Sequence, residues 1–215
     1  MTYSADEEWL KKCRPENLPV PPFDSPRDEN ELRTLEIVRQ YTNIPVPKLV
    51  YRGEGFNVFE RIPGFTIFEG PIWDSISPRQ QEGIKLQVQG YIKALAKVPN
   101  ESGGVRSLSA SGEIIHNQLP HRGPFQSTGD FLRSYKEEDA HLIHQINPLS
   151  KAVLSHMDWD LSNIVLHPNM DAVPGVIDWE RAAFFPEGGR SIHRMCHQWQ
   201  GWETLFDGIE FPLQG

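Results

Sequence analysis

Residues 156–180, HMDWDLSNIVLHPNMDAVPGVIDWE, are the most informative segment of the sequence about the fold. It contains two short runs of β-forming residues, 163–166 and 174–178, separated by the turn residues of 167–171. Such runs around a polar turn predict a β-hairpin. The hairpin would return the chain to the loop before its first strand, so the oxygen-bearing side chains at its two ends would meet.

Three of these side chains suit phosphoryl transfer. That reaction needs a magnesium ion held by hard oxygen ligands and a carboxylate that orients the acceptor hydroxyl and takes its proton. Asp158 is the predicted base, and Asn163 and Asp178 are the predicted metal ligands. His156 belongs to the predicted catalytic set because it would hold the loop by side-chain hydrogen bonds. The structural alternative is that the three polar residues only cap the ends of strands.

With its hairpin and second aspartate, the pattern H-x-D-x4-N followed by I-D-W resembles the aminoglycoside phosphotransferase and choline kinase-like family, nearest to its branch common in filamentous fungi. The resemblance extends to ENELRTLEIVRQYTNIPVPKLV (29–50) and NVFERIPG (57–64), and it covers roughly residues 29–189. It implies an α+β, protein kinase-like fold, mainly the helical C-terminal lobe with a catalytic-loop hairpin and a reduced N-terminal lobe.

The resemblance also implies ATP and Mg²⁺ as cofactors and gives roles to residues upstream of the hairpin. Glu31 would be the partner of an ATP-orienting lysine, and Phe59, Glu60 and Arg61 would line the edge of the nucleotide. From the residues alone, Glu31 is equally a solvated charge on an exposed helix face.

The resemblance predicts a truncated N-terminal lobe. We expect a Pro-rich lead-in over 1–28, a remnant of the N-lobe over 29–62, and the C-lobe over 63–215. The lead-in contains no glycine, and Lys11 and Lys12 lie in a charged stretch instead of an apolar strand. Without a phosphate-covering loop and its lysine, transfer would be slower by several orders of magnitude.

The expected function is ATP- and Mg²⁺-dependent O-phosphotransfer to a small hydroxylated molecule, with Glu180, Trp159 and Trp179 near the substrate. Two alternatives remain open. One is a repurposed lobe that catalyses ATP-independent acid/base chemistry, such as cyclisation, dehydration or condensation, in specialised metabolism. The other is a pseudokinase without catalytic activity.

Composition narrows the class of protein. The 215 residues include 21 Lys and Arg against 29 Asp and Glu, a net charge of -8, so nucleic acid is not an expected partner. The apolar runs are too short to cross a membrane, and the N-terminus lacks the apolar core of a signal peptide, so a cytoplasmic protein is expected. The resemblance makes 57–64 the hinge strand and its connector, and a homodimer would be one way to cover the edge of that strand.

Apolar periodicity predicts a helix over 28–42 and a long helix that begins at Pro78 with Ser77 as its cap. A further helix, capped by Ser127 or Thr128, is expected to pack on the long one, and the tail over 188–215 is expected to add another helix. Strands are expected over 48–52 and 57–62.

The histidines suggest a rival kind of site. His193 and His197 are spaced four residues apart, Cys196 lies between them, and His141 and His144 occur elsewhere in the chain. Together they could ligate a transition metal. A partly buried helix face is the alternative interpretation.

Overall fold

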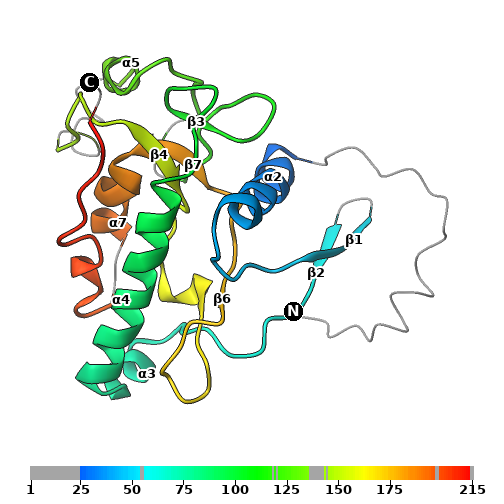
Figure 1. Cartoon of the computed structure of the whole chain (residues 1–215), viewed down its shortest axis with the longest axis vertical. Coiled ribbons are helices and arrows are strands. Elements are labelled where there is room, and N and C mark those ends of the chain that lie inside the picture. Colours follow the sequence, from blue (N-terminus) through cyan, green and yellow to red (C-terminus); the bar gives the residue numbers. More distant parts are fainter. Residues whose placement is uncertain are drawn as a thin grey trace.

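A computed structural model describes residues 25–53, 56–117, 119, 121–135, 143, 145–196 and 199–213. Figure 1 shows a long central helix, α4, with short sheets and helices on its two sides and a β-ribbon at one edge. Lys11 and Lys12 lie outside the described residues.

The first described element is α2 (Pro26–Tyr41), which confirms the expected helix. Ser25 caps it, because its Oγ accepts a hydrogen bond from the Asp28 N–H, and proline occupies the first helical position. Leu32, Leu35 and Val38 are on the buried face of the helix. The chain then leaves as an extended segment, since two prolines follow.

Two strands, β1 (Leu49–Gly53) and β2 (Phe56–Phe59), pair antiparallel as a ribbon at the edge of the molecule. The short α3 (Gly70–Ser75) leads into α4 (Pro78–Leu95). Ser77 caps α4 as predicted, and Ile84, Val88, Ile92 and Leu95 form its buried stripe.

A three-stranded sheet has the order β3-β7-β4, from β3 (Arg106–Ser107), β7 (Ala183–Pro186) and β4 (Ala152–Ser155). Both pairings are antiparallel. β7 was not predicted, although all four of its residues are buried. It matters for the site because it directly follows the Asp178 segment and brings that segment back beside the start of the catalytic loop.

The predicted hairpin is present. β5 (Ile164–Val165) and β6 (Gly175–Val176) pair antiparallel, with Ile164 opposite Val176. The Val176 N–H also donates to the Pro45 carbonyl at 2.9 Å, which ties the hairpin to the segment after α2.

The remaining helices are α5 (Thr128–Arg133), capped by Ser127, and α7 (Arg190–Cys196) in the tail. The buried residues of α4 belong to a large apolar cluster with α2, the hairpin and the C-terminal tryptophans. Phe131 of α5 belongs to a second cluster around the three-stranded sheet. The expectation that these two helices pack on each other is therefore wrong, because the sheet offers Phe131 its own aromatic partner, Phe185.

Candidate active site

The catalytic loop begins directly after β4. Met157 has φ of 68°, a left-handed backbone that is uncommon for a residue other than glycine, and its N–H donates to Ser155 Oγ at 3.3 Å. Residues held in this region concentrate at functional sites. The turn leaves the Asp158 side chain 20% exposed after a strand whose last three residues are buried.

Asn163 is held against the predicted base. It ends a short 3₁₀ helix, Leu161–Asn163, whose cap Asp160 accepts from the Ser162 N–H at 2.9 Å. Asn163 Nδ2 donates to the Asp158 carbonyl at 3.1 Å. This bond fixes the side-chain amide, so its Oδ1 is directed away from that carbonyl and is the atom that could ligate a cation.

His156 joins the catalytic loop to the segment that carries Asp178. It is fully buried between Trp159 and Trp179, and its Nε2 hydrogen-bonds the Ile177 carbonyl at 2.8 Å. Burial lowers the pKa of His156 to about 4, so the ring is neutral at pH 7 and donates to the carbonyl. The ring therefore holds together the two loops that bear the predicted base and the predicted ligand.

Asp178 follows the hairpin in a second left-handed conformation, with φ of 63°. The Ile177 N–H before it donates to the Asn163 carbonyl at 3.0 Å, which closes the hairpin onto the catalytic loop. The Asp178 side chain is exposed, and within the described part of the chain its carboxylate makes no hydrogen bond or ion pair. The segments that carry the three residues of the predicted triad are thus joined by backbone and amide hydrogen bonds, and their joint role stays a prediction.

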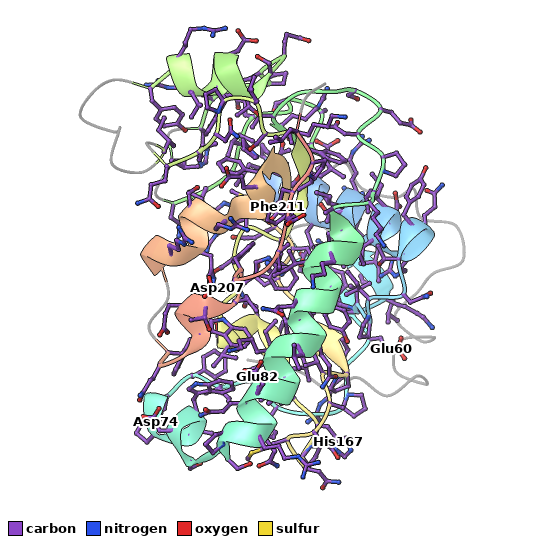
Figure 2. All side chains as sticks on the ribbon, turned by 60° about the vertical axis from the view of Figure 1, so that its left-hand side comes forward. Glu60, Asp74, Glu82, His167, Asp207 and Phe211 are labelled. Carbon is purple, nitrogen blue, oxygen red and sulfur yellow. The ribbon has the colours of Figure 1, made fainter. Side chains whose placement is uncertain are left out.

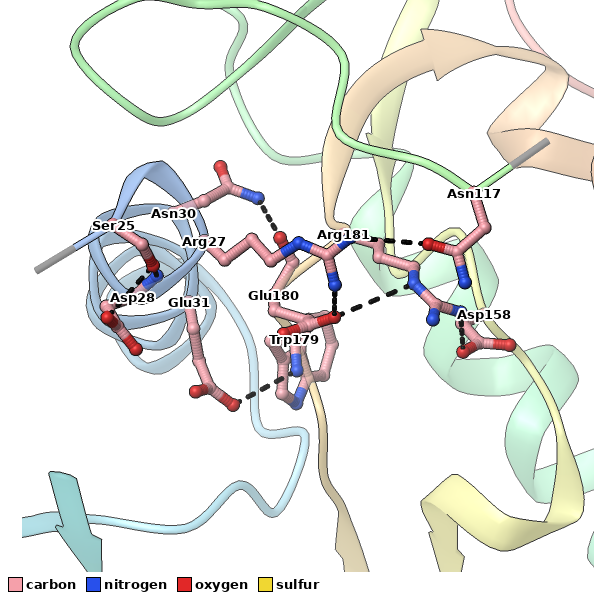
Figure 3. Close-up of polar contacts among 10 residues, drawn as sticks. All are labelled: Ser25, Arg27, Asp28, Asn30, Glu31, Asn117, Asp158, Trp179, Glu180 and Arg181. Carbon is pink, nitrogen blue, oxygen red and sulfur yellow. Dashed lines mark hydrogen bonds and ion pairs between the residues drawn. The ribbon is translucent and has the colours of Figure 1, made fainter. Parts of the chain in front are cut away.

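Glu31 of α2 lies beside Asp178. Its Oε1 accepts from the Trp179 N–H at 3.3 Å (Figure 3). Burial, followed by the charge of Asp178, raises the pKa of Glu31 to about 7. Glu31 and Asp178 each disfavour the negative charge of the other, and the causes of the raised pKa of Glu31 include no cation. A cation bound beside them would therefore be stabilised.

The donor set fits magnesium. Mg²⁺ is commonly held by one or two protein oxygens, with waters and substrate phosphates as its other ligands. Asp178 and the Asn163 amide oxygen supply that number. Among the residues described, no three His, Cys, Asp or Glu side chains gather as an all-protein cage.

An ion-pair chain that the sequence did not predict runs from α2 to Asp158 (Figure 3). Arg27 donates to Glu180 Oε1 at 2.6 Å, and Arg181 Nη1 donates to Asp158 Oδ2 at 2.5 Å. Arg181 Nε also lies 3.8 Å from Glu180. Burial raises the pKa of Asp158, and the charge of Arg181 opposes that rise, which favours the ionised carboxylate.

The profile of the phosphotransferase enzyme family matches residues 13–186 of this chain. The chain belongs to the phosphotransferase enzyme family. The matched residues include the predicted catalytic loop, the hairpin and β7, which are the elements that build the site described above.

Two curated proteins are similar to this family member. A probable acyl-CoA dehydrogenase, IBR3, of Arabidopsis thaliana is 23% identical over 170 residues, and acyl-CoA dehydrogenase family member 10 of Mus musculus is 22% identical over 189. The matches cover 71% and 82% of this chain but only 20% and 17% of those proteins. Each relative is therefore similar along a minor part of its length.

Solved structures share the fold. The gentamicin complex of APH(2")-IIa has a TM-score of 0.57 and 16% identity, and covers 87% of this chain and 67% of its own. The streptomycin–ATP complex of APH(2")-IIa, with 18% identity, and the GDP and kanamycin complex of APH(2")-IIia, with 17% identity, both have TM-scores of 0.52. They cover 80% and 81% of this chain, and 61% and 65% of their own chains. These structures share the fold of this chain, which confirms the predicted α+β, kinase-like fold.

The residues predicted at the nucleotide edge lie at the end of the ribbon and directly after it. Phe59 ends β2 and packs partly against the large apolar cluster, whereas Glu60 and Arg61 are exposed. Figure 2 shows Glu60 at the margin of the molecule. Ile62, the next residue, packs against Gly175, where a Cβ would come within 2.4 Å of its side chain. The segment after β2 is therefore in contact with the hairpin. Nucleotide contact by Phe59, Glu60 and Arg61 stays a prediction.

The two tryptophans predicted near the substrate are core residues as well. Trp179 Nε1 donates to the Val176 carbonyl at 2.9 Å, and the Trp159 carbonyl accepts from Trp202 at 2.6 Å. Trp179 is fully buried and Trp159 is 3% exposed. The structure uses both rings to enclose His156, and contact with a substrate stays a prediction.

The rival metal site can be followed only at His193. This side chain is buried, and its Nε2 hydrogen-bonds the Trp202 carbonyl at 2.9 Å. His141, His144, His197 and the side chain of Cys196 lie outside the described residues.

Sequence reasoning missed a second layer of residues around Asp158. His116 is buried, hydrogen-bonds the Met157 backbone and lies near Arg181, and burial lowers its pKa to about 4. Asn117 accepts from Arg27 at 3.3 Å. Both come from a Gly/Ser-rich loop without helical or strand periodicity, so only a three-dimensional contact could have identified them.

None of the described helices is long and apolar enough to cross a membrane.

Proposed function

We propose that this chain transfers the γ-phosphoryl group of ATP to a hydroxyl of a small molecule. The acceptor oxygen forms a bond to the γ-phosphorus while the bond from that phosphorus to the β–γ bridging oxygen breaks. ADP leaves, and Asp158 takes the hydroxyl proton. The observation that supports the proposal is that the His156–Ile177 and Asn163–Asp158 hydrogen bonds join the segments that carry Asp158, Asn163 and Asp178.

Each residue has a distinct task. Asn163 Oδ1 and Asp178 would hold a magnesium ion, which neutralises the charge of the phosphates. Arg181 keeps Asp158 oriented and ionised, so that the carboxylate can accept a proton at neutral pH. Glu31 faces the same place and would pair with a lysine or another cation of the nucleotide site.

The acceptor class follows from the family and from the structural neighbours. Those neighbours are complexes with gentamicin, streptomycin and kanamycin, which supports a small hydroxylated acceptor here. Because identity to them is below a fifth, the fold carries over, and the individual acceptor does not.

Two variants of the full-length chain test the proposal. Calorimetric titration with Mg·ATP should give saturable binding to the wild type and to Asp158→Asn, whereas Asp178→Asn should weaken binding about tenfold or more, a loss of about 1.4 kcal/mol. Transfer of labelled γ-phosphate to a panel of aminoglycosides and other polyhydroxylated molecules should be abolished in Asp158→Asn. Absence of Mg-dependent ATP binding would contradict the proposal. Turnover of an acceptor without nucleotide would instead support acid/base chemistry.

A further inference from the structure

Two arginines lie beside the same oxygen atom of Glu180. Arg27 Nη1, from the first turn of α2, donates to Glu180 Oε1 at 2.6 Å, whereas Arg181 Nε lies 3.8 Å from that atom (Figure 3). The first distance is that of a hydrogen bond, and the second is too long for one. Arg27 therefore occupies an acceptor that Arg181 could otherwise use.

Arg181 has a donor that is not satisfied. Its Nη1 donates to Asp158 Oδ2 at 2.5 Å, but its Nε is buried and has no hydrogen-bond partner among the described residues. A buried donor without an acceptor is costly, so Arg181 would gain if its Nε reached Glu180. Because the guanidinium is a rigid plane, a shift that brings Nε to Glu180 would displace Nη1 from its place beside Asp158.

The other titratable groups near Arg181 are less able to compete for it. Asp160 accepts from the Ser162 N–H at 2.9 Å and from Trp199 Nε1 at 3.1 Å, one bond on each of its oxygens. His116 lies near Arg181, and burial lowers its pKa to about 4, so its ring is neutral at pH 7. Among the described residues, Glu180 is therefore the carboxylate that competes with Asp158 for Arg181.

Glu180 would stay within reach of Arg181 even without Arg27. Its backbone is held separately by α2, because Asn30 Nδ2 donates to the Glu180 carbonyl at 2.8 Å. The Glu180 side chain is 27% exposed and that of Arg181 is 20% exposed, so their interaction is only partly screened by solvent. Removal of the Arg27 cation would free Glu180 Oε1 without moving the backbone that carries it.

We propose that Arg27 is a positioning residue for Asp158: it holds Glu180 Oε1 and thereby keeps Arg181 on the Asp158 carboxylate. The consequence for catalysis rests on the proposed function, in which Asp158 is the base. The choice that Arg181 makes between Asp158 and Glu180 does not rest on it, and it can be measured without nucleotide or acceptor.

NMR of the ¹⁵N-labelled full-length chain measures that choice through the Nε–H signal of Arg181. Loss of the signal in Arg181→Lys assigns it. In Arg27→Gln the proton signal should move downfield, because the N–H gains a charged acceptor. Arg27→Lys retains a cation for Glu180, so its signal should shift less. In the Glu180→Gln background, the further change Arg27→Gln should leave the signal in place, because the competing carboxylate is absent.

Arg133→Gln is the matched control. Arg133 also forms an ion pair with a carboxylate, Asp130, but it is 73% exposed and lies on α5. Its substitution should leave the Arg181 signal unchanged.

The same variants form a double-mutant cycle for phosphoryl transfer from Mg·ATP to the acceptor panel described above. Arg27→Gln should lower kcat about tenfold, because a base that loses its orienting partner is misplaced, and the KM for ATP should not change. In the Glu180→Gln background the same substitution should lower kcat by less than about twofold. A general loosening of α2 would instead lower kcat by the same factor in both backgrounds.

The proposal is overturned if the Arg181 signal stays at its wild-type position in Arg27→Gln. It is equally overturned if Arg27→Gln shifts that signal to the same extent with and without Glu180→Gln, because Glu180 would then not be the competitor. A wild-type chain that phosphorylates none of the acceptors would contradict the proposed function alone. The NMR signal would still decide whether Arg27 sets the partner of Arg181.

Discussion

The proposed catalytic side of the molecule, segment 156–182, and its proposed hinge side, the β1–β2 ribbon, are held in different ways. The segment 156–182 is tied by buried hydrogen bonds: His156 reaches Ile177, and the fully buried Asn30 binds two carbonyls of the 180–182 segment. On the ribbon, Phe56 is 54% exposed, and the Lys48–Glu60 ion pair has a separation of 4.0 Å with both side chains largely in solvent.

This difference indicates which part of the site is preorganised. The proposed base and ligands are positioned by contacts within the C-terminal lobe and α2, independently of any nucleotide. The ribbon is a two-stranded sheet, a unit that is marginal alone, and it is held at its ends, through Pro45 and Ile62. We infer that the part of the site around Asp158 and Asp178, which would hold the phosphates (the phosphate end), is rigid. The part beside the ribbon, which would hold the adenine (the adenine end), takes its final shape when the nucleotide binds.

The largest effect is expected where the catalytic side is tied to α2. Asn30 is fully buried, and Asn30→Leu would remove the partners of three backbone groups, those of Glu180, Ala182 and Leu108, of which the Ala182 bond is buried and the other two are part-buried. At about 1–3 kcal/mol for each unsatisfied group, the free energy of unfolding should fall by about 3 kcal/mol or more. Denaturant unfolding measures it.

Asn117→Leu is the control for that change, because Asn117 is exposed and its bond among the described residues is to the Arg27 side chain. Its effect should remain below about 1 kcal/mol. If both variants lost equal stability, α2 would not be anchored through Asn30.

An intermediate effect is expected at Glu31, at the boundary of the two regions. Its pKa is raised from 4.5 to about 7, so the folded state holds the proton more tightly than the unfolded chain. That contribution to stability is complete below pH 4.5 and is lost as pH rises through about 7. Glu31→Gln keeps the acceptor for Trp179 but removes the charge. It should be more stable than the wild type by up to about 3 kcal/mol at about pH 8, and no more stable near pH 4.

Thermal unfolding of the two proteins across this pH range checks the expectation. Glu36→Gln is the control, because Glu36 lies on the exposed part of the same helix. Saturating Mg²⁺ should reduce the advantage of Glu31→Gln if a cation occupies the space beside Asp178. If the gain in stability of Glu31→Gln were independent of pH, Glu31 would not be a carboxyl whose pKa is raised by burial.

The sequence predicted what is local and periodic. The Ser77 cap of α4, the apolar stripe of the same helix and the hairpin after Asn163 all depend on residues a few positions apart. The hairpin alone was enough to bring Asn163 and Asp178 together, because its register sets where both ends lie.

What the sequence did not predict depends on long-range contacts. Arg27 and Glu180 are 153 residues apart, and Asn30 and Ala182 are 152 apart. No periodicity relates such residues, so neither the ion-pair chain nor the anchor of α2 could be derived. β7 was missed because a short, fully buried apolar run has no alternation to mark it as a strand.

The smallest change in stability is expected on the hinge side. A substitution there should affect nucleotide binding without affecting the free energy of unfolding. Arg61 is exposed and sits beyond the end of β2, so Arg61→Ala should alter the free energy of unfolding by less than about 0.5 kcal/mol. If the hinge meets the nucleotide, the same variant should weaken Mg·ATP binding by about threefold to tenfold, which calorimetry detects. Lys97→Ala, an exposed residue just after α4, is the control and should change neither quantity. Unchanged ATP affinity in Arg61→Ala would show that this edge of the ribbon takes no part in nucleotide binding. Phe59 would then be the residue through which the ribbon could still contact the adenine.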